Sequence, residues 1–222
     1  MNYKIRVELK SDALIGSGEG FGAIIDTDVI FDDVGIPYIP GRRIKGCLRD
    51  SANEVYRMFE KSTISNFINL SKNGKDFAVI NKVFGTPENP SCLNISNLTI
   101  EEYENSKTSL KRLFKDCPAI LSKDEVVSFF AITRQQTKIN DDGVADEHSL
   151  RTVRAVKKGN VFEGGIFINN SDLDTLKLLW FACLNLRHLG TKRNRGFGEV
   201  ECKLFDDNKP IEFEKDLEGV CR

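Results

Sequence analysis

Two segments, one near each end of the chain, alternate between apolar and polar residues, and this pattern constrains the fold most. Residues 3–10 read Tyr-Lys-Ile-Arg-Val-Glu-Leu-Lys, and residues 199–205 alternate in a similar way. A period of two residues is typical of a strand that has one buried and one solvated face. Half-buried strands are therefore expected at both positions.

The chain between these strands carries both helical and strand-like patterns. A long helix is expected to start after Pro40, because apolar residues recur there at helical spacing. A later helix is expected to open at Ser171, with Asp174 completing a capping box, and to end at Gly190. Four strands and two more helices are expected in this order: strand 24–31, helix 75–84 stopped by Gly85, strand 91–100, helix 101–115, strand 126–132 and strand 161–168.

These elements do not alternate regularly between strand and helix, so an α+β fold is expected rather than a doubly wound sheet. A ferredoxin-like sheet fits their order. Residues 133–158 are polar and basic, and Asp142-Gly143 marks the tip of a hairpin. An insertion that carries a β-hairpin is therefore expected at about 119–165. Residues 1–206 are interpreted as one domain, and residues 207–222 as a loose C-terminal tail.

The charge of the chain is balanced, with a formal net charge of −1 over 222 residues. No global basic field marks the chain as nucleic-acid-binding, so any RNA site has to be a local patch. The six cysteines form no Cys-x-x-Cys pair, so no structural zinc site is expected. The N-terminus lacks the apolar run of a signal peptide, and no apolar stretch is long enough to span a bilayer. A cytoplasmic protein without a membrane partner is expected.

A basic, glycine-rich loop separates the last helix from the last strand. Residues 187–198 read Arg-His-Leu-Gly-Thr-Lys-Arg-Asn-Arg-Gly-Phe-Gly. Glycine lets backbone amides approach phosphate, Lys and Arg neutralise its charge, and the Phe ring can either stack on a base or pack inward. The loop is therefore predicted to contact the RNA backbone, through Lys192, Arg193, Asn194, Arg195, Gly196, Phe197 and Gly198.

Four further cations lie in the first turns of the first long helix: Arg42, Arg43, Lys45 and Arg49. The helix dipole disfavours cations near the N-terminus, where Arg42 and Arg43 fall, and a bound anion would offset this effect. RNA contact is one interpretation of these residues. Ordinary solvated cations are the other, and the sequence leaves both open.

Asp26 and Asp28 follow a glycine-rich segment, residues 16–22. Residues 18–23 formally match a dinucleotide fingerprint, but a strand-like run rather than a helix comes next, which excludes that site. A calcium loop of the EF-hand type is excluded because Phe31 and Pro37 occupy the positions of its required glycine and glutamate. Since two carboxylates here would repel RNA, they are candidates for a catalytic role.

Taken together, these pieces resemble the RAMP superfamily, and in particular the backbone-type subunits of type III CRISPR–Cas complexes. An Ile-Asp element at 25–26 precedes Gly-Ile-Pro-Tyr-Ile-Pro-Gly-Arg-Arg-Ile-Lys-Gly-Cys-Leu-Arg at 35–49, which is similar to the family signature. The motif order continues with three similar features. The first is Val-Phe-Gly at 83–85 followed by 91–97, and the second is Arg134 with Gly143, Ser149, Leu150 and the run 157–162. The third is the glycine-rich loop 190–198.

The resemblance implies a ferredoxin-like (RRM-like) core whose inserted β-hairpin is a thumb. It implies CRISPR RNA, target RNA and other RAMP and type III subunits as partners, with Arg134 among the RNA-binding residues. In nuclease members an aspartate at the position of Asp26 cuts target RNA. Asp26 would either help to activate the 2′-hydroxyl or hold a divalent metal such as Mg²⁺ near the scissile phosphate. Asp28 is a departure from the commonest backbone-type subunits, and it makes this segment similar to that of end-capping subunits. A non-catalytic scaffold and a guide-processing ribonuclease that uses His188 are the alternatives.

Overall fold

The computed structural model describes residues 3–16, 25–26, 28–60, 78–141, 143–146, 148–169 and 172–214. Its centre is an antiparallel sheet with the strand order β2-β6-β1-β7-β8, and β3 also pairs with β6. The bounds of these strands are β1 (Tyr3–Leu9), β2 (Leu93–Ile95), β3 (Thr99–Ile100), β6 (Val161–Ile168), β7 (Val200–Asp206) and β8 (Lys209–Pro210).

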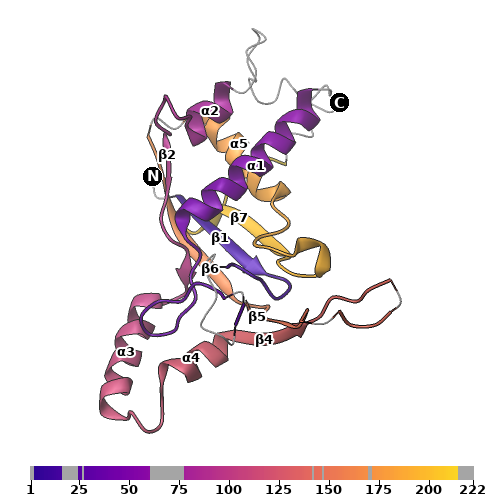
Figure 1. Ribbon diagram of the computed structural model, residues 1–222. Coiled ribbons are helices and arrows are strands. Elements are labelled where there is room, and N and C mark those ends of the chain that lie inside the picture. The colour runs from indigo at the N-terminus through magenta and orange to yellow at the C-terminus, as the bar shows by residue number, and fades with distance from the viewer. Residues whose placement is uncertain are drawn as a thin grey trace.

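Three helices pack together against the sheet: α1 (Gly41–Glu60), α2 (Ala78–Phe84) and α5 (Leu173–Asn185) (Figure 1). The crossover through α1 joins β1 to β2, and β6 lies between those two strands. The crossover through α5 joins β6 to β7, and β1 lies between them. Two split β-α-β units thus form an α+β core, in the strand order that a ferredoxin-like sheet has.

The sequence periods explain this core. In β1, Ile5 and Val7 are fully buried while Lys4 and Arg6 face solvent, as the alternation predicted. The buried face of α1 includes Ile44, and that helix begins directly after Pro40, also as predicted. Pro is well suited to the start of a helix because it lacks the N–H that would be left unpaired there.

A second, smaller unit lies at the opposite end of the sheet from α2 (Figure 1). It consists of α3 (Tyr103–Asp116), α4 (Lys123–Phe130) and a separate two-stranded hairpin, β4 (Ala131–Gln136) with β5 (Arg151–Val156). The hairpin falls within the insertion expected at 119–165 and projects away from the sheet. A single isolated bridge, Ala13 to Val156, connects β5 to the segment that follows β1.

Two strand predictions are wrong. Residues 126–132 mostly belong to α4, whose N-terminus is closed by a capping box between Ser122 and Glu125. The described residues between 25 and 31 form isolated bridges, Val29 with Gly16 and Phe31 with Pro37, rather than a regular strand. A short apolar run does not distinguish a buried helix from a strand, and the local cap decided for the helix.

The ends of α5 also differ from the prediction. Asp172 is the N-cap and accepts a hydrogen bond from the Thr175 N–H; Ser171, the expected cap, lies outside the described residues. The helix ends at Asn185, five residues before Gly190, which instead has a positive φ of 92° within the following loop. Asp142, expected at the hairpin tip, is likewise outside the described residues, whereas Gly143 has a positive φ there.

The segment expected to be a loose tail is ordered over its first residues. Lys209 and Pro210 form β8 on the edge of β7, and the Phe213 ring contacts the buried Trp180 ring with centroids 5.6 Å apart. The predictions for 215–222 lie outside the described residues. Within the described part of the chain, no helix has the length and apolar character needed to cross a bilayer.

Candidate nucleic-acid interface

The basic loop is closed at its base by the main chain and lies between α5 and β7. The Leu189 N–H donates to the Gly198 carbonyl at 2.7 Å, and His188 forms a bridge with Glu199. A Cβ on Gly198 would lie 2.0 Å from the Leu189 carbonyl oxygen, and one on Gly190 would lie 2.4 Å from that of Leu14. Two of the loop's glycines are therefore required by close approach within the protein itself.

Gly196 differs from those two glycines. It also has a positive φ, 75°, but a Cβ built there meets no atom within 4 Å. It directly follows a short 3₁₀ turn, Arg193–Arg195, in which all three side chains are exposed. Arg193 Nε donates to the Gly190 carbonyl at 3.1 Å, and the stretch as a whole is the most exposed part of the loop.

The loop meets the β-hairpin and Asp26 in space, although Lys192 is 56 residues from Gln136 and more than 100 residues from Asp26 in sequence. The Lys192 ammonium group donates to the side-chain carbonyl of Gln136 on β4. Burial and the charges of Arg195 and Arg151 lower the pKa of Lys192, while the charge of Asp26 acts in the opposite direction. The three segments thus form one surface, which we call the hairpin–loop junction and define by Asp26, Gln136, Arg151, Lys192 and Arg195.

Asp26 is exposed at this junction and held by β5. Its backbone N–H donates to the Thr152 carbonyl at 2.9 Å, and the Thr152 N–H donates to Asp26 Oδ2 at 2.7 Å. The carboxylate therefore accepts one hydrogen bond from the hairpin backbone, and its charge opposes the lowering of the Lys192 pKa. A carboxylate in this position can accept a proton from a bound hydroxyl.

Asp28 has a different environment from Asp26. It is only 7% exposed; Oδ1 accepts from the Val29 N–H at 2.7 Å, and Oδ2 lies 3.1 Å from Arg154 Nη1 on β5. The two carboxylates that the sequence analysis grouped together therefore face different partners. In this conformation Asp28 is a buried residue whose ion pair with Arg154 connects the segment that contains Asp26 to the hairpin.

Arg134 extends the basic surface along β4. Its guanidinium lies over the Phe197 ring, 5.3 Å from the centroid, and also bonds the Asp12 carboxylate. Phe197 itself is 4% exposed and packs in a cluster with Leu14 and Val153. Of the two roles considered for this ring, the structure places it inward, where it supports Arg134 instead of facing a base.

The cations at the start of α1 separate into two kinds. Lys45 donates to Ser91 Oγ and to the Leu93 carbonyl, each at 2.7 Å, so its amine is engaged within the protein. Burial lowers the pKa of Lys45. Arg42 is exposed, while Arg43 and Arg49 are half-buried. Of the four predicted cations of α1, only these three arginines have a charge available for a ligand.

The β5 strand contributes two arginines that the sequence analysis did not single out. Arg151 is exposed at the junction, and Arg154 is the partner of Asp28. The available signal was the basic composition of residues 133–158, which does not say which side chains face the loop. Strand alternation places Arg151 and Val153 on the same face and does not show which side chains of β5 reach the loop. The twist and pairing of the hairpin decide that.

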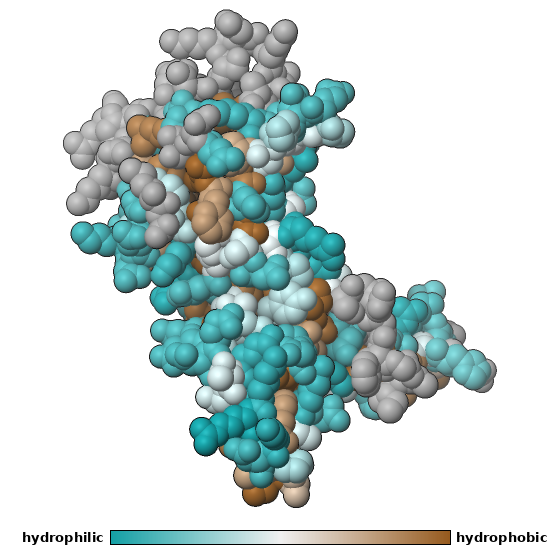
Figure 2. All heavy atoms as spheres, turned by 90° about the vertical axis from the view of Figure 1, so that its left-hand side faces the viewer, coloured by the Kyte–Doolittle hydropathy of each residue, from teal (hydrophilic) through white to brown (hydrophobic). Residues whose placement is uncertain are grey.

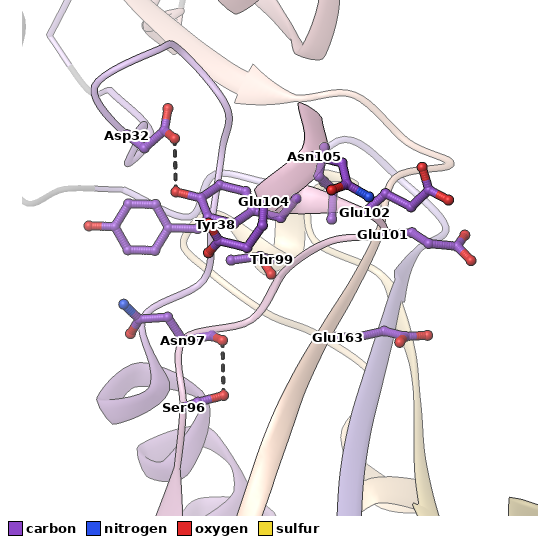
Figure 3. Close-up of a pocket in the computed structure, with 12 residues that line it drawn as sticks. Asp32, Tyr38, Ser96, Asn97, Thr99, Glu101, Glu102, Glu104, Asn105 and Glu163 are labelled. Carbon is purple, nitrogen blue, oxygen red and sulfur yellow. Dashed lines mark hydrogen bonds between the residues drawn. The ribbon is translucent and has the colours of Figure 1, made fainter. Parts of the chain in front are cut away.

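A larger cavity, of about 770 Å³, lies away from the junction beside α3. Figure 3 shows its carboxylate-rich lining, including Glu101, Glu102, Glu104 and Glu163. Asp32 is part of it and acts as a turn residue, because its Oδ1 accepts hydrogen bonds from the N–H groups of Val34 and Ile36. The neighbouring face is predominantly hydrophilic (Figure 2). The negative charge of the cavity lining makes the cavity unsuited to binding phosphate.

Metal binding and acid–base chemistry by histidine depend on which side chains come together in the described part of the chain. No group of three or more His, Cys, Asp or Glu side chains there could hold a metal ion. Mg²⁺ is commonly bound by one or two carboxylates together with substrate phosphates and water, so an ion at Asp26 would take most of its ligands from RNA. His188 is exposed beside the loop, and His148 is exposed on the hairpin.

Comparisons with known proteins identify relatives of this fold. A family model described as the RAMP superfamily matches residues 6–201. The structure is similar to "Cryo-EM structure of the Type III-B Cmr-beta bound to cognate target RNA", with a TM-score of 0.62 at 14% identity over 92% of this chain and 97% of that one. It is equally similar to "Type III-B Cmr-beta Cryo-EM structure of the Apo state", with a TM-score of 0.62 at 15% identity over 93% of this chain and 98% of that one. No curated protein matches by sequence.

Proposed function

Since this chain belongs to the RAMP superfamily, we propose that it is an RNA-binding subunit of a type III CRISPR ribonucleoprotein complex. The solved structures that it resembles are of type III-B complexes, one of them bound to target RNA. CRISPR RNA, target RNA and other subunits of such a complex are the partners that this proposal assigns to the chain.

One observation carries the proposal: the basic loop, the hairpin and Asp26 form a single surface. Lys192 reaches Gln136 on the hairpin, Arg151 and Arg195 lie close enough to influence its charge, and Arg134 continues the surface along β4. A local cluster of cations is sufficient to bind a phosphate backbone even when the net charge of the chain is near zero. Because phosphate contacts carry no sequence information, such a surface suits a protein that accepts many guides.

The test replaces Lys192, Arg193 and Arg195 together by Ala and measures binding to several unrelated RNA sequences over a range of salt concentrations. Three lost phosphate contacts should reduce the slope of log affinity against log salt by about two, since each contact on a single strand contributes ~0.7. The loss should be equal for all sequences.

The matched control replaces Lys111, Arg112 and Lys115, three exposed cations on α3. This control variant has the same change in net charge but should retain the wild-type salt slope. A loop variant that binds at full strength, or that loses affinity for one sequence alone, contradicts the proposed surface.

A second candidate function, cleavage of target RNA, is favoured by the exposure of Asp26 beside Lys192. The Asp26 carboxylate would take the proton of a ribose 2′-hydroxyl, whose oxygen attacks the adjacent phosphorus. The bond from phosphorus to the 5′-oxygen then breaks, and Lys192 would protonate that leaving oxygen. The products are a 2′,3′-cyclic phosphate and a 5′-hydroxyl.

Replacing Asp26 by Asn in the assembled complex tests this candidate. Guide binding should persist while cleavage slows by about 10²–10⁴-fold, the usual contribution of a positioned acid or base. Loss of cleavage on adding a chelator would assign Mg²⁺ a part in the reaction. Cleavage at the wild-type rate by the Asp26 variant would leave the chain a scaffold or end-cap subunit. Loss of guide processing in a His188→Ala variant would instead favour the processing ribonuclease.

A further inference from the structure

A cleft of about 450 Å³ lies on the other side of the basic loop, between α1 and the end of α5. Arg187 and Arg193 line it from the loop side, and Asp50 and Glu54 line it from α1. Its volume is within the range of small-ligand sites, which is about 300–1,000 Å³. Arg193 belongs to the predicted RNA-binding loop. An RNA strand bound along that loop would therefore reach this cleft.

Glu54 is held in place by a chain of hydrogen bonds that links α1 to α5. Asn185 Nδ2 donates to Glu54 Oε2 at 2.9 Å and also to Ser51 Oγ at 3.2 Å. Ser51 is 4% exposed, and its hydroxyl donates to the Ala182 carbonyl at 2.8 Å. The buried Ser51 hydroxyl positions the Asn185 amide, and the amide in turn positions Oε2 of Glu54. Among the described residues, no further hydrogen bond occupies the other oxygen, Oε1.

The position of this carboxylate has to be reconciled with RNA binding. A phosphate at the acidic end of the cleft would be repelled by Glu54 and Asp50, whereas one at the basic end would be attracted by Arg187 and Arg193. A nucleotide that lies across the cleft therefore needs a hydrogen-bond donor at its acidic end. The ribose 2′-hydroxyl is a donor that every RNA nucleotide carries and that DNA lacks.

We propose that this cleft holds one ribonucleotide of the bound RNA strand, with its phosphate at Arg193 and its 2′-hydroxyl donating to Glu54. Glu54 would then distinguish RNA from DNA without reading the base, as acidic residues that bond ribose hydroxyls do in nucleotide-binding folds. This inference rests on the proposed RNA binding at the loop, and it adds the group by which the chain recognises the sugar.

The experiment measures the affinity of the full-length chain for one sequence in three forms: RNA, DNA, and RNA with every 2′-hydroxyl replaced by 2′-O-methyl. Wild type should bind RNA best. In a Glu54→Ala variant the preference for RNA over either analogue should fall about tenfold, the usual worth of a hydrogen bond to a charged group. The fall should come from weaker RNA binding, since the analogues offer no donor to lose.

Glu199→Ala is the matched control, because Glu199 is an exposed glutamate next to the same loop that does not line the cleft. It should change affinity for all three forms equally. A Glu54→Ala variant that keeps the wild-type preference overturns the inference. Wild type that binds none of the three refutes the proposed RNA binding itself. Competition of RNA binding by millimolar AMP, but not by dAMP, would support the same contact.

Discussion

The ion pair between Asp28 and Arg154 is predicted to stabilise the protein and to hold Asp26 in position. The two side chains are only 10% and 20% exposed, and their charged atoms are 3.1 Å apart. Removing one partner from a buried pair costs about 3–5 kcal/mol when the remaining charge is uncompensated, and less when that charge keeps other contacts, as Arg154 does with the Phe31 ring. We expect the lower end of this range for Asp28→Asn, because Arg154 keeps some contact with solvent.

Chemical denaturation of Asp28→Asn, Arg154→Met and the double variant measures the pair directly. A destabilisation of about 3 kcal/mol corresponds to a fall in Tm of about 6–12 °C for a chain of this size. The double variant should be less destabilised than the sum of the single variants, with a coupling energy of about 1–3 kcal/mol. Exchange of the Thr152 amide proton, which bonds Asp26 Oδ2, should accelerate in both single variants.

The control for this measurement is the pair of Arg6 and Glu163, whose side chains are 45% and 31% exposed. Its coupling energy should be at most about 1 kcal/mol, as for other surface ion pairs. A coupling energy below about 0.5 kcal/mol for Asp28 with Arg154 would refute the reasoning, since pairs that weak behave as independent sites. Unchanged exchange at Thr152 would remove the link to Asp26.

Three further outcomes are expected. Gly198→Ala should lower the free energy of unfolding by at least ~2 kcal/mol, measured by denaturation, because its φ of 77° is strained for Ala and its Cβ would meet the Leu189 carbonyl. Phe197→Leu should keep RNA affinity within about twofold in a binding titration, whereas a ring stacked on a base would lose ~1–3 kcal/mol. Hydrogen bonds from Lys82 and from the N-terminus of α5 lower the pKa of Asp172 to about 2. The stabilisation that Asp172 provides is therefore present above the ordinary carboxylate pKa and is lost as pH falls towards 2. Asp172→Asn should flatten the pH dependence of the free energy of unfolding in that range.

Where the sequence carried a long, regular period, the prediction of the fold was right. The alternation in β1 and β7 and the helical spacing in α1 extend over enough residues to decide between helix and strand. The prediction failed at α4, where the apolar run is short and both interpretations fit it. The Ser122 and Glu125 capping box was visible in the sequence and would have favoured the helix.

The candidate site shows the same division for a different reason. The sequence by itself identified the basic loop and Asp26, because cations interleaved with glycine and a carboxylate after a glycine-rich segment are local patterns. Whether a side chain is free or engaged depends on residues far away along the chain: Asp28 is buried by Arg154, Lys45 bonds Ser91, and Phe197 packs beneath Arg134. No local pattern encodes those partners, since hydrogen bonds and burial arise only when the sheet brings distant segments together. Tertiary structure alone therefore decided which of the predicted residues are exposed and which are engaged within the protein.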